Sequence, residues 1–129
     1  MVASLQDAYK QAVPAVALDT LIANLNPENY RAVKDTHFEN VVINVGADGE
    51  LLSVFIPKRA EFKTTDVYDI YQIEYLPTEK ELTVLQKDIV QNLKQARKWM
   101  PAKFIGVNVR NQIFVQVYFR NGKPAISNY

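Results

Sequence analysis

Few residues of this chain have the types that acid–base or metal chemistry requires. His37 is the single histidine, and there is no cysteine. One imidazole cannot build a histidine-based metal cluster, and a Ser/His/Asp triad would depend wholly on it. The lack of cysteine also excludes a disulfide, a thiolate nucleophile and cysteine-bound zinc within these residues. We interpret His37 as a structural or surface residue.

The spacing of Asp48, Glu61 and Lys63 matches the bare pattern of a metal-dependent nuclease, an Asp followed by Glu-x-Lys. Metal ligands must converge from rigid positions. Asp48 falls in a predicted tight turn and the Glu61 to Lys63 segment in a predicted loop, so convergence is not expected. The nuclease is therefore the weakest functional hypothesis. We expect a protein that is not an enzyme and that carries no metal or cofactor.

Charge is distributed very unevenly along the chain. Residues 94–129 contain seven Lys or Arg and no Asp or Glu, whereas residues 1–93 contain eight basic and fourteen acidic residues. The net charge of +1 at pH 7 therefore conceals an acidic part and a basic part. A basic surface attracts polyanions or an acidic protein partner.

The basic segment also has the alternation that is typical of β-strands. Residues 103–109 and 113–120 predict a hairpin with a loop at 110–112. In that register the branched residues face the core and the aromatic residues face outward. The expected inward set is Ile105, Val107, Val109, Ile113, Val115 and Val117.

Aromatic rings beside basic residues are typical of surfaces that bind single-stranded nucleic acid. Each base can stack on a ring while Lys and Arg neutralise the backbone, and a stack contributes about 1–3 kcal/mol. The sequence therefore predicts that single-stranded DNA or RNA binds to the outer face of this hairpin. The expected binding residues are Trp99, Phe104, Asn108, Arg110, Phe114, Gln116, Tyr118 and Arg120, with Lys94, Arg97, Lys98, Lys103 and Lys123 adding charge.

A second interpretation of the same face remains open. Aromatic residues also occur on the second face of a sheet that is covered on both sides, here by amino-terminal helices. Asn108 and Gln116 favour a half-exposed face, because burying an unsatisfied polar group costs about 1–3 kcal/mol. In the competing function the chain is a protein-interaction or structural subunit, such as a homodimer, a viral or phage accessory protein, or the partner of an acidic protein.

Helix formers are frequent near the start of the chain. Ser4 with Asp7 has the form of a capping box and predicts a helix that starts there. Pro14 either kinks this helix or starts a second one. Asn26 predicts the start of a short helix over residues 27–33.

Strand patterns begin at Phe38. Two alternating apolar runs are separated by Asp48 and Gly49, which predict a two-residue turn of primed type. Residues 66–76 predict a third strand. The expected cross-strand pairs of the first two strands are Val45 with Leu52, Ile43 with Val54, and Val41 with Ile56.

A long helix is predicted after the third strand. Thr78 with Glu81 has the form of a capping box, and apolar residues then recur at helical spacing up to Pro101. The pattern predicts one amphipathic helix of about six turns over residues 78–100. Its expected buried residues are Leu85, Ile89 and Leu93, and its expected exposed residues are Lys87, Gln91 and Lys94.

Together these elements predict an α+β fold in a single domain over residues 1–129. It contains amino-terminal helices, an antiparallel sheet of about five strands, and one long amphipathic helix between strands 3 and 4. No run of about eighteen apolar residues occurs, so no membrane span is predicted. The apolar stretch after Pro14 lacks the basic start of a signal peptide. We therefore expect a soluble protein of the cytoplasm.

Overall fold

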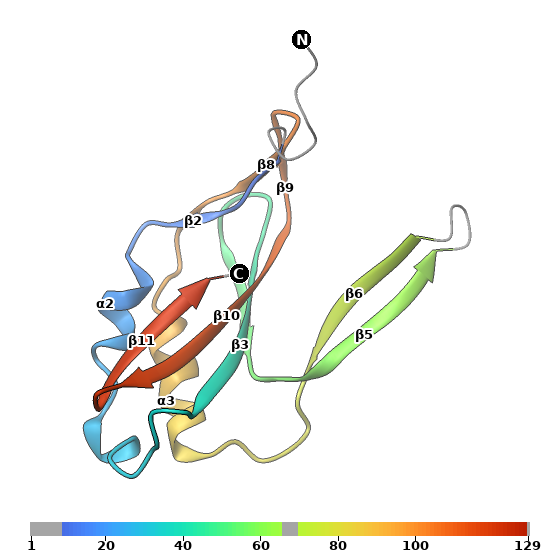
Figure 1. Ribbon diagram of the computed structural model, residues 1–129. Helices are drawn as coiled ribbons and strands as arrows, with labels where there is room; N and C mark the ends of the chain where they lie inside the picture. The colour runs from blue at the N-terminus through green and yellow to red at the C-terminus, as the bar shows by residue number, and fades with distance from the viewer. Residues whose placement is uncertain (1–8, 66–69, 129) are drawn as a thin grey trace.

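The computed structural model describes residues 9–65 and 70–128, and it leaves the side chains of residues 59–65, 70–74 and 128 undescribed. Strands dominate the described residues, and the two α-helices are short (Figure 1). The predicted α+β class with a long helix between strands 3 and 4 is therefore wrong. Only parts of the predicted helices are present, as α2 (Leu18–Ile22) and α3 (Val84–Leu93), and strands and loops replace the rest.

The main sheet has four antiparallel strands in the order β11-β10-β3-β4. Asn121 and Gly122 join the last two strands, and both have positive φ, at 53° and 74°. An Asn-Gly pair with positive φ at both positions is the preferred primed hairpin turn. The predicted pairing of residues 113–120 with residues 103–109 is wrong, because the neighbours of β10 in the sheet are β11 and β3. The strand bounds are β3 Phe38–Val45, β4 Leu51–Phe55, β10 Asn111–Arg120 and β11 Lys123–Asn128.

The described residues form three smaller sheets besides the main one. The first has the order β1-β8-β9, the second pairs β2 with β7, and the third pairs β5 with β6. In Figure 1 the β5–β6 hairpin extends away from the rest of the described chain, and we call it the arm. The bounds are β1 Tyr9–Lys10, β2 Val13–Pro14, β5 Pro57–Thr65, β6 Ile70–Pro77, β7 Trp99–Met100, β8 Ala102–Phe104 and β9 Val107–Val109.

The arm confirms one predicted strand and corrects one predicted loop. The strand expected over residues 66–76 is present as β6 from Ile70, and residues 66–69 lie outside the described residues. The expected loop around Glu61 and Lys63 is instead part of β5. Alternation is weak in this segment, and pairing with β6 supplies the hydrogen bonds that the isolated segment lacks.

The first described residues form strands where a helix was predicted. Pro14 pairs with Trp99 at a sheet edge, where a missing backbone N–H costs little. The first α-helix in the described residues is α2, Leu18–Ile22. The short helix expected over residues 27–33 is present as a single 3₁₀ turn, η1 Pro27–Asn29, capped by the Asn26 side chain. The predicted start at Ser4 lies outside the described residues.

Helix α3, Val84–Leu93, is much shorter than the predicted helix over residues 78–100. Its capping box joins Thr83 and Gln86 rather than Thr78 and Glu81. The Thr78 N–H donates to the Ile56 carbonyl at 2.8 Å, which fixes that residue at the base of the arm. After α3, the predicted turns of helix are replaced by backbone hydrogen bonds to the β3–β4 hairpin. The Leu51 N–H donates to the Arg97 carbonyl, and the Trp99 N–H donates to the Gly49 carbonyl.

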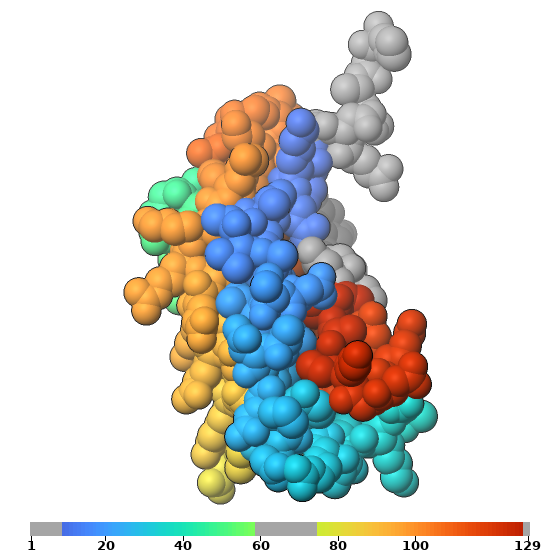
Figure 2. Space-filling model, turned by 90° about the vertical axis from the view of Figure 1, so that its left-hand side faces the viewer, coloured from blue at the N-terminus to red at the C-terminus, as the bar shows by residue number. Residues whose placement is uncertain are grey.

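The predicted buried face of that helix is confirmed. Leu85, Ile89 and Leu93 are buried, and Lys87, Gln91 and Lys94 are exposed. Helices α2 and α3 contribute to the same buried cluster as the apolar residues of β3 and β10, so both helices cover one face of the sheet. Figure 2 shows the α2 segment in blue between the α3 segment and the carboxyl-terminal strands. The shared buried residues of the sheet are Val41, Ile43, Val45, Ile113, Val115, Val117 and Phe119.

The β3–β4 hairpin has the predicted centre but a different turn. Ile43 pairs with Val54 as expected, whereas Val45 pairs with Leu51 across a bulge, and Leu52 is exposed. The Gly46 N–H donates to the Glu50 carbonyl and the Gly49 N–H to the Gly46 carbonyl. Among the residues of this turn only Gly49 has positive φ, at 84°, so the loop has three residues rather than two.

Candidate nucleic-acid interface

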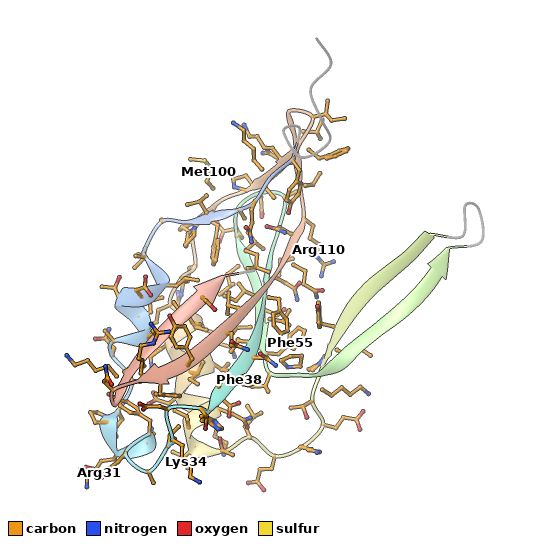
Figure 3. All side chains as sticks on the ribbon, in the orientation of Figure 1. Arg31, Lys34, Phe38, Phe55, Met100 and Arg110 are labelled. Carbon is orange, nitrogen blue, oxygen red and sulfur yellow. The ribbon has the colours of Figure 1, made fainter. Side chains whose placement is uncertain are left out.

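The second face of the main sheet, opposite the helices, carries an aromatic surface. Strand alternation and register place residues of β3, β4 and β10 on it. We call this surface the aromatic face and define it by Phe38, Asn40, Phe55, Phe114, Gln116 and Tyr118. Figure 3 labels Phe38 near the start of β3 and Phe55 nearer the base of the arm.

Phe38 and Tyr118 form the most open part of the aromatic face. They are direct partners across β3 and β10, and Phe38 is 50% exposed. The guanidinium carbon of Arg120 lies 5.5 Å from the centroid of the Tyr118 ring, which is within cation–π distance. Two rings and one cation therefore meet at the end of the sheet nearest the β10–β11 turn.

Polar side chains on the same face are hydrogen-bonded to one another. The Gln116 Nε2 atom donates to Asn40 Oδ1 at 3.2 Å, two register pairs along from Phe38 and Tyr118 and so on the same face. The Asn44 Nδ2 atom donates to Ser53 Oγ at 2.9 Å. Because these polar groups are already paired, the face needs no covering element to satisfy them.

The other end of the aromatic face is partly covered by the base of the arm. The Tyr75 ring of β6 packs on Phe114 with centroids 5.1 Å apart and planes tilted by 37°. Phe114, Gln116 and Tyr118 are each half-buried. The alternative in which amino-terminal helices cover this face is therefore wrong for the described residues, since α2 lies on the opposite side.

No family model, curated protein or solved structure matches this chain. The arrangement of its own residues is therefore the basis for any functional inference.

Trp99 lies in the core and not on the predicted binding surface. It is 7% exposed, and its indole N–H donates to the Ala96 carbonyl at 2.6 Å. Its backbone N–H donates to the Gly49 carbonyl, which ties it to the β3–β4 turn. A ring in this position has no open face for a base.

The β8–β9 hairpin separates another part of the predicted site from the aromatic face. Lys103, Phe104 and Asn108 are exposed on this hairpin, which belongs to a different sheet. Its turn residues are Ile105 and Gly106, so Ile105 is 66% exposed and not buried. The predicted inward position of Val107 is wrong for the same reason, because it pairs with Phe104 rather than with β10.

Three basic residues of the segment that follows α3 lie beside the β3–β4 hairpin. Lys94 and Arg97 line a shallow depression with Glu50 and Leu51. The Lys98 ammonium forms an ion pair with Glu50, and the hydrogen bond and the charge of that carboxylate raise the pKa of Lys98. The charge of Lys98 is thus already partnered within the chain.

The basic residues of the carboxyl-terminal segment therefore occupy separate places. Arg120 and Lys123 are exposed register partners at the β10–β11 turn. Arg110 is exposed between β9 and β10, at some distance from this turn in Figure 3. Only the first two adjoin the Phe38 and Tyr118 end of the aromatic face.

Phe38 and Phe55 are functional candidates that sequence reasoning missed. Phe38 begins the alternating series that continues through Asn40, Val42 and Asn44, so its face could be read from the sequence once the strand was recognised. The pairing with Tyr118 is not visible in the sequence, because it depends on which strand lies beside β3.

The candidate catalytic residues lie on separate elements. The His37 Nε2 atom lies 2.8 Å from Glu39 Oε1 on the surface. Asp48 accepts a hydrogen bond from the Glu50 N–H within the β3–β4 turn, whereas Glu61 and Lys63 belong to the arm. Within the part of the chain that the structure describes, no three His, Cys, Asp or Glu residues are grouped to hold a metal. None of the described helices is long and apolar enough to cross a membrane.

Proposed function

We propose that this chain is a non-enzymatic protein that binds single-stranded DNA or RNA on its aromatic face. The Phe38 and Tyr118 pair carries this proposal, because it offers two neighbouring rings on an open sheet surface. Successive bases stack on aromatic side chains regardless of sequence, and each stack contributes about 1–3 kcal/mol. The expected ligand is therefore a short single strand with little base preference.

Cations at the edge of the face support the same ligand. Arg120 and Lys123 are opposite each other across the β10–β11 hairpin, next to the Tyr118 ring. Phosphates of a strand whose bases stack on Phe38 and Tyr118 would pass this turn. Each phosphate contact releases counterions, so affinity should fall as salt rises.

The test is a titration of fluorescent single-stranded oligonucleotides at two salt concentrations. Phe38→Ala and Tyr118→Ala should each weaken binding by about 1–3 kcal/mol. Phe104→Ala is the matched control, since Phe104 is a 40% exposed aromatic residue on a different sheet. Absence of wild-type binding at low salt, or equal losses in all three variants, would rule out the aromatic face as the site.

A second candidate function is a structural or interaction subunit that assembles with a second copy. The arm favours it, because an extended two-stranded hairpin is marginally stable without further packing. The two functions use different surfaces. The described ring pair between the arm and the aromatic face is Tyr75 with Phe114, and it lies at the base of the arm.

A further inference from the structure

Strand β4 is an edge of the main sheet, and within the described residues its neighbour in that sheet is β3 alone. The segment after α3 adjoins only the start of its other side. There Glu50 forms a bridge with Lys98, and the Leu51 N–H donates to the Arg97 carbonyl at 3.1 Å. Residues 52–55 have no such neighbour in the described part of the chain. A strand edge with open backbone groups is a template for pairing with another chain.

Two depressions lie along the boundary between β4 and α3, and we call this boundary the β4–α3 seam. Their volumes are about 330 and 350 Å³. The start of β4 shares the first depression with the end of α3, and the end of β4 leads to the second, beside the start of α3. One is lined by Glu50, Leu51, Leu52, Ser53, Lys94 and Arg97, and the other includes Ile56, Thr83 and Gln86.

The strand and the helix therefore run in opposite directions along the seam, and their lengths agree. Thr83 and Lys94 are about 17 Å apart along the helix at 1.5 Å per residue. Leu51 and Ile56 are also about 17 Å apart along the strand at 3.3 Å per residue. A seam of this length accommodates about five residues of an extended peptide.

The seam has a basic end and an end of mixed charge. Beside the start of β4, Lys94 and Arg97 are exposed, and no ion pair among the described residues involves either of them. Glu50 lines the same depression, but its carboxylate is already paired with Lys98. A ligand of the seam should therefore be acidic at this end. At the other end charges of both signs occur, on Lys58, Lys80 and Glu81.

We propose that the seam binds an acidic peptide in extended conformation, as an added strand antiparallel to β4. The bridge between Glu50 and Lys98 is itself antiparallel, so the peptide would lie along the same edge, ahead of Arg97. In this direction the carboxyl end of the peptide, with its acidic residues, lies beside Lys94 and Arg97. Backbone hydrogen bonds to the edge provide affinity, and the two cations select the charge.

The chemistry of the edge favours a peptide over a nucleic acid. An open strand edge offers both N–H donors and C=O acceptors, and a peptide backbone supplies the complement of both. Phosphate oxygens only accept hydrogen bonds, so a nucleic-acid backbone would leave the β4 carbonyl groups without donors. Leu52, which is 52% exposed in the first depression, adds an apolar contact for a side chain of the peptide.

Fluorescence anisotropy with two designed peptides tests the charge selection. One probe alternates Thr and Val and ends in a pair of Glu residues, and the matched probe ends in a pair of Lys residues. The Glu probe should bind at least about tenfold more tightly, because like charges across an interface oppose binding. Equal binding of the two probes, or no binding of the Glu probe up to about 1 mM, would overturn the proposal.

Variants of the basic end test the two cations. Lys94→Gln combined with Arg97→Gln should weaken binding of the Glu probe about tenfold, because two exposed ion pairs are lost. Lys87→Gln is the matched control, since Lys87 is exposed on the same helix and lines neither depression. It should change the affinity less than about twofold. Equal losses in the double variant and the control would exclude Lys94 and Arg97 from the site.

Nuclear magnetic resonance and N-methylated probes test strand addition. The backbone amide signals of residues 52–55 should shift when the Glu probe is added. Two further Glu probes carry N-methyl groups on one or the other set of alternate residues. The probe that loses the donors facing β4 should bind about tenfold more weakly, and the other probe should bind as before. Equal binding of both, or shifts confined to other residues, would overturn the added strand.

This proposal does not rest on nucleic-acid binding. Phe38 begins β3, whereas Lys94 and Arg97 lie beside the opposite end of that strand, at the β3–β4 hairpin. The double variant of the basic end should therefore still bind oligonucleotides, so the two proposals fail separately. An oligonucleotide that displaces the Glu probe and shifts the amides of residues 52–55 would identify a phosphate site and overturn the peptide proposal.

Discussion

Asn111 accepts a hydrogen bond at its Oδ1 atom from the backbone N–H of Ala12, at 3.0 Å and ninety-nine positions earlier in the chain. Its Nδ2 atom donates to the Tyr9 hydroxyl at 2.8 Å. Asn111 is buried at the start of β10, so one side chain fastens the first described strands to the main sheet. This contact explains how short strands of two residues remain in place.

Replacing Asn111 with Ala should destabilise the domain by about 1–3 kcal/mol, because it leaves the buried Ala12 N–H without an acceptor. Urea denaturation measures the loss. Asn111→Asp is the matched control: it keeps the acceptor, and the Tyr9 hydroxyl can donate to it, so a smaller loss is expected. If both variants lose the same stability, the bond to Ala12 is not the stabilising contact.

Ile89 is fully buried at the centre of α3, and Ile89→Ala should cost about 2–5 kcal/mol. Thermal and urea denaturation should agree on this loss. Gln91→Ala, on the exposed face of the same helix, should change stability by about half a kcal/mol or less. A loss under half a kcal/mol for Ile89→Ala would show that this face does not pack in the core.

Ile105 occupies the left-handed region at φ 51°, which strains a branched side chain by about 1–2 kcal/mol. Ile105→Asn should raise stability by about 1 kcal/mol, because Asn tolerates this backbone and the exposed Ile side chain buries little. The reciprocal Asn121→Ile, in a turn with φ 53°, should lower stability by a similar amount. Changes of the same sign in both variants would contradict this explanation.

Salt dependence should distinguish the arginines if the aromatic face binds nucleic acid. Arg120→Ala should lower affinity and make the slope of log affinity against log salt shallower by about one, as expected for the loss of one phosphate contact. Arg110→Ala should change the slope less, since Arg110 lies away from the β10–β11 turn (Figure 3). Identical slopes for Arg120→Ala and wild type would remove this residue from the interface.

Local patterns predicted part of the fold correctly. The helical spacing of Leu85, Ile89 and Leu93 identified a buried face, because that spacing depends on a single element. The pairing of Ile43 with Val54 followed from the nearby turn, although the turn itself has one more residue than predicted. Helix length was overestimated because the pattern cannot show that the chain after Leu93 bonds to the β3–β4 turn.

The candidate site was only partly predictable, because it depends on strand partners. The alternation of β10 correctly identified the outward set of Phe114, Gln116 and Tyr118, but the partner strand was wrong. The sequence does not predict the β8–β9 turn, because a branched residue such as Ile105 rarely adopts positive φ. By contrast, the turn at Asn121 and Gly122 has a clear local pattern, because Asn-Gly is the preferred pair where both turn residues have positive φ.

The position of β10 between β3 and β11 also sets the folding route. Its partner β3 is separated from it in sequence by the arm, α3 and the small sheets, so a large loop must close before the two strands can pair. Non-local pairing of this kind slows folding, and we expect relaxation in about milliseconds to seconds rather than microseconds. Until β10 docks, β3 and β4 form only a two-stranded hairpin, which is marginally stable alone. The sheet therefore forms cooperatively, in a late step that completes the core and the aromatic face together.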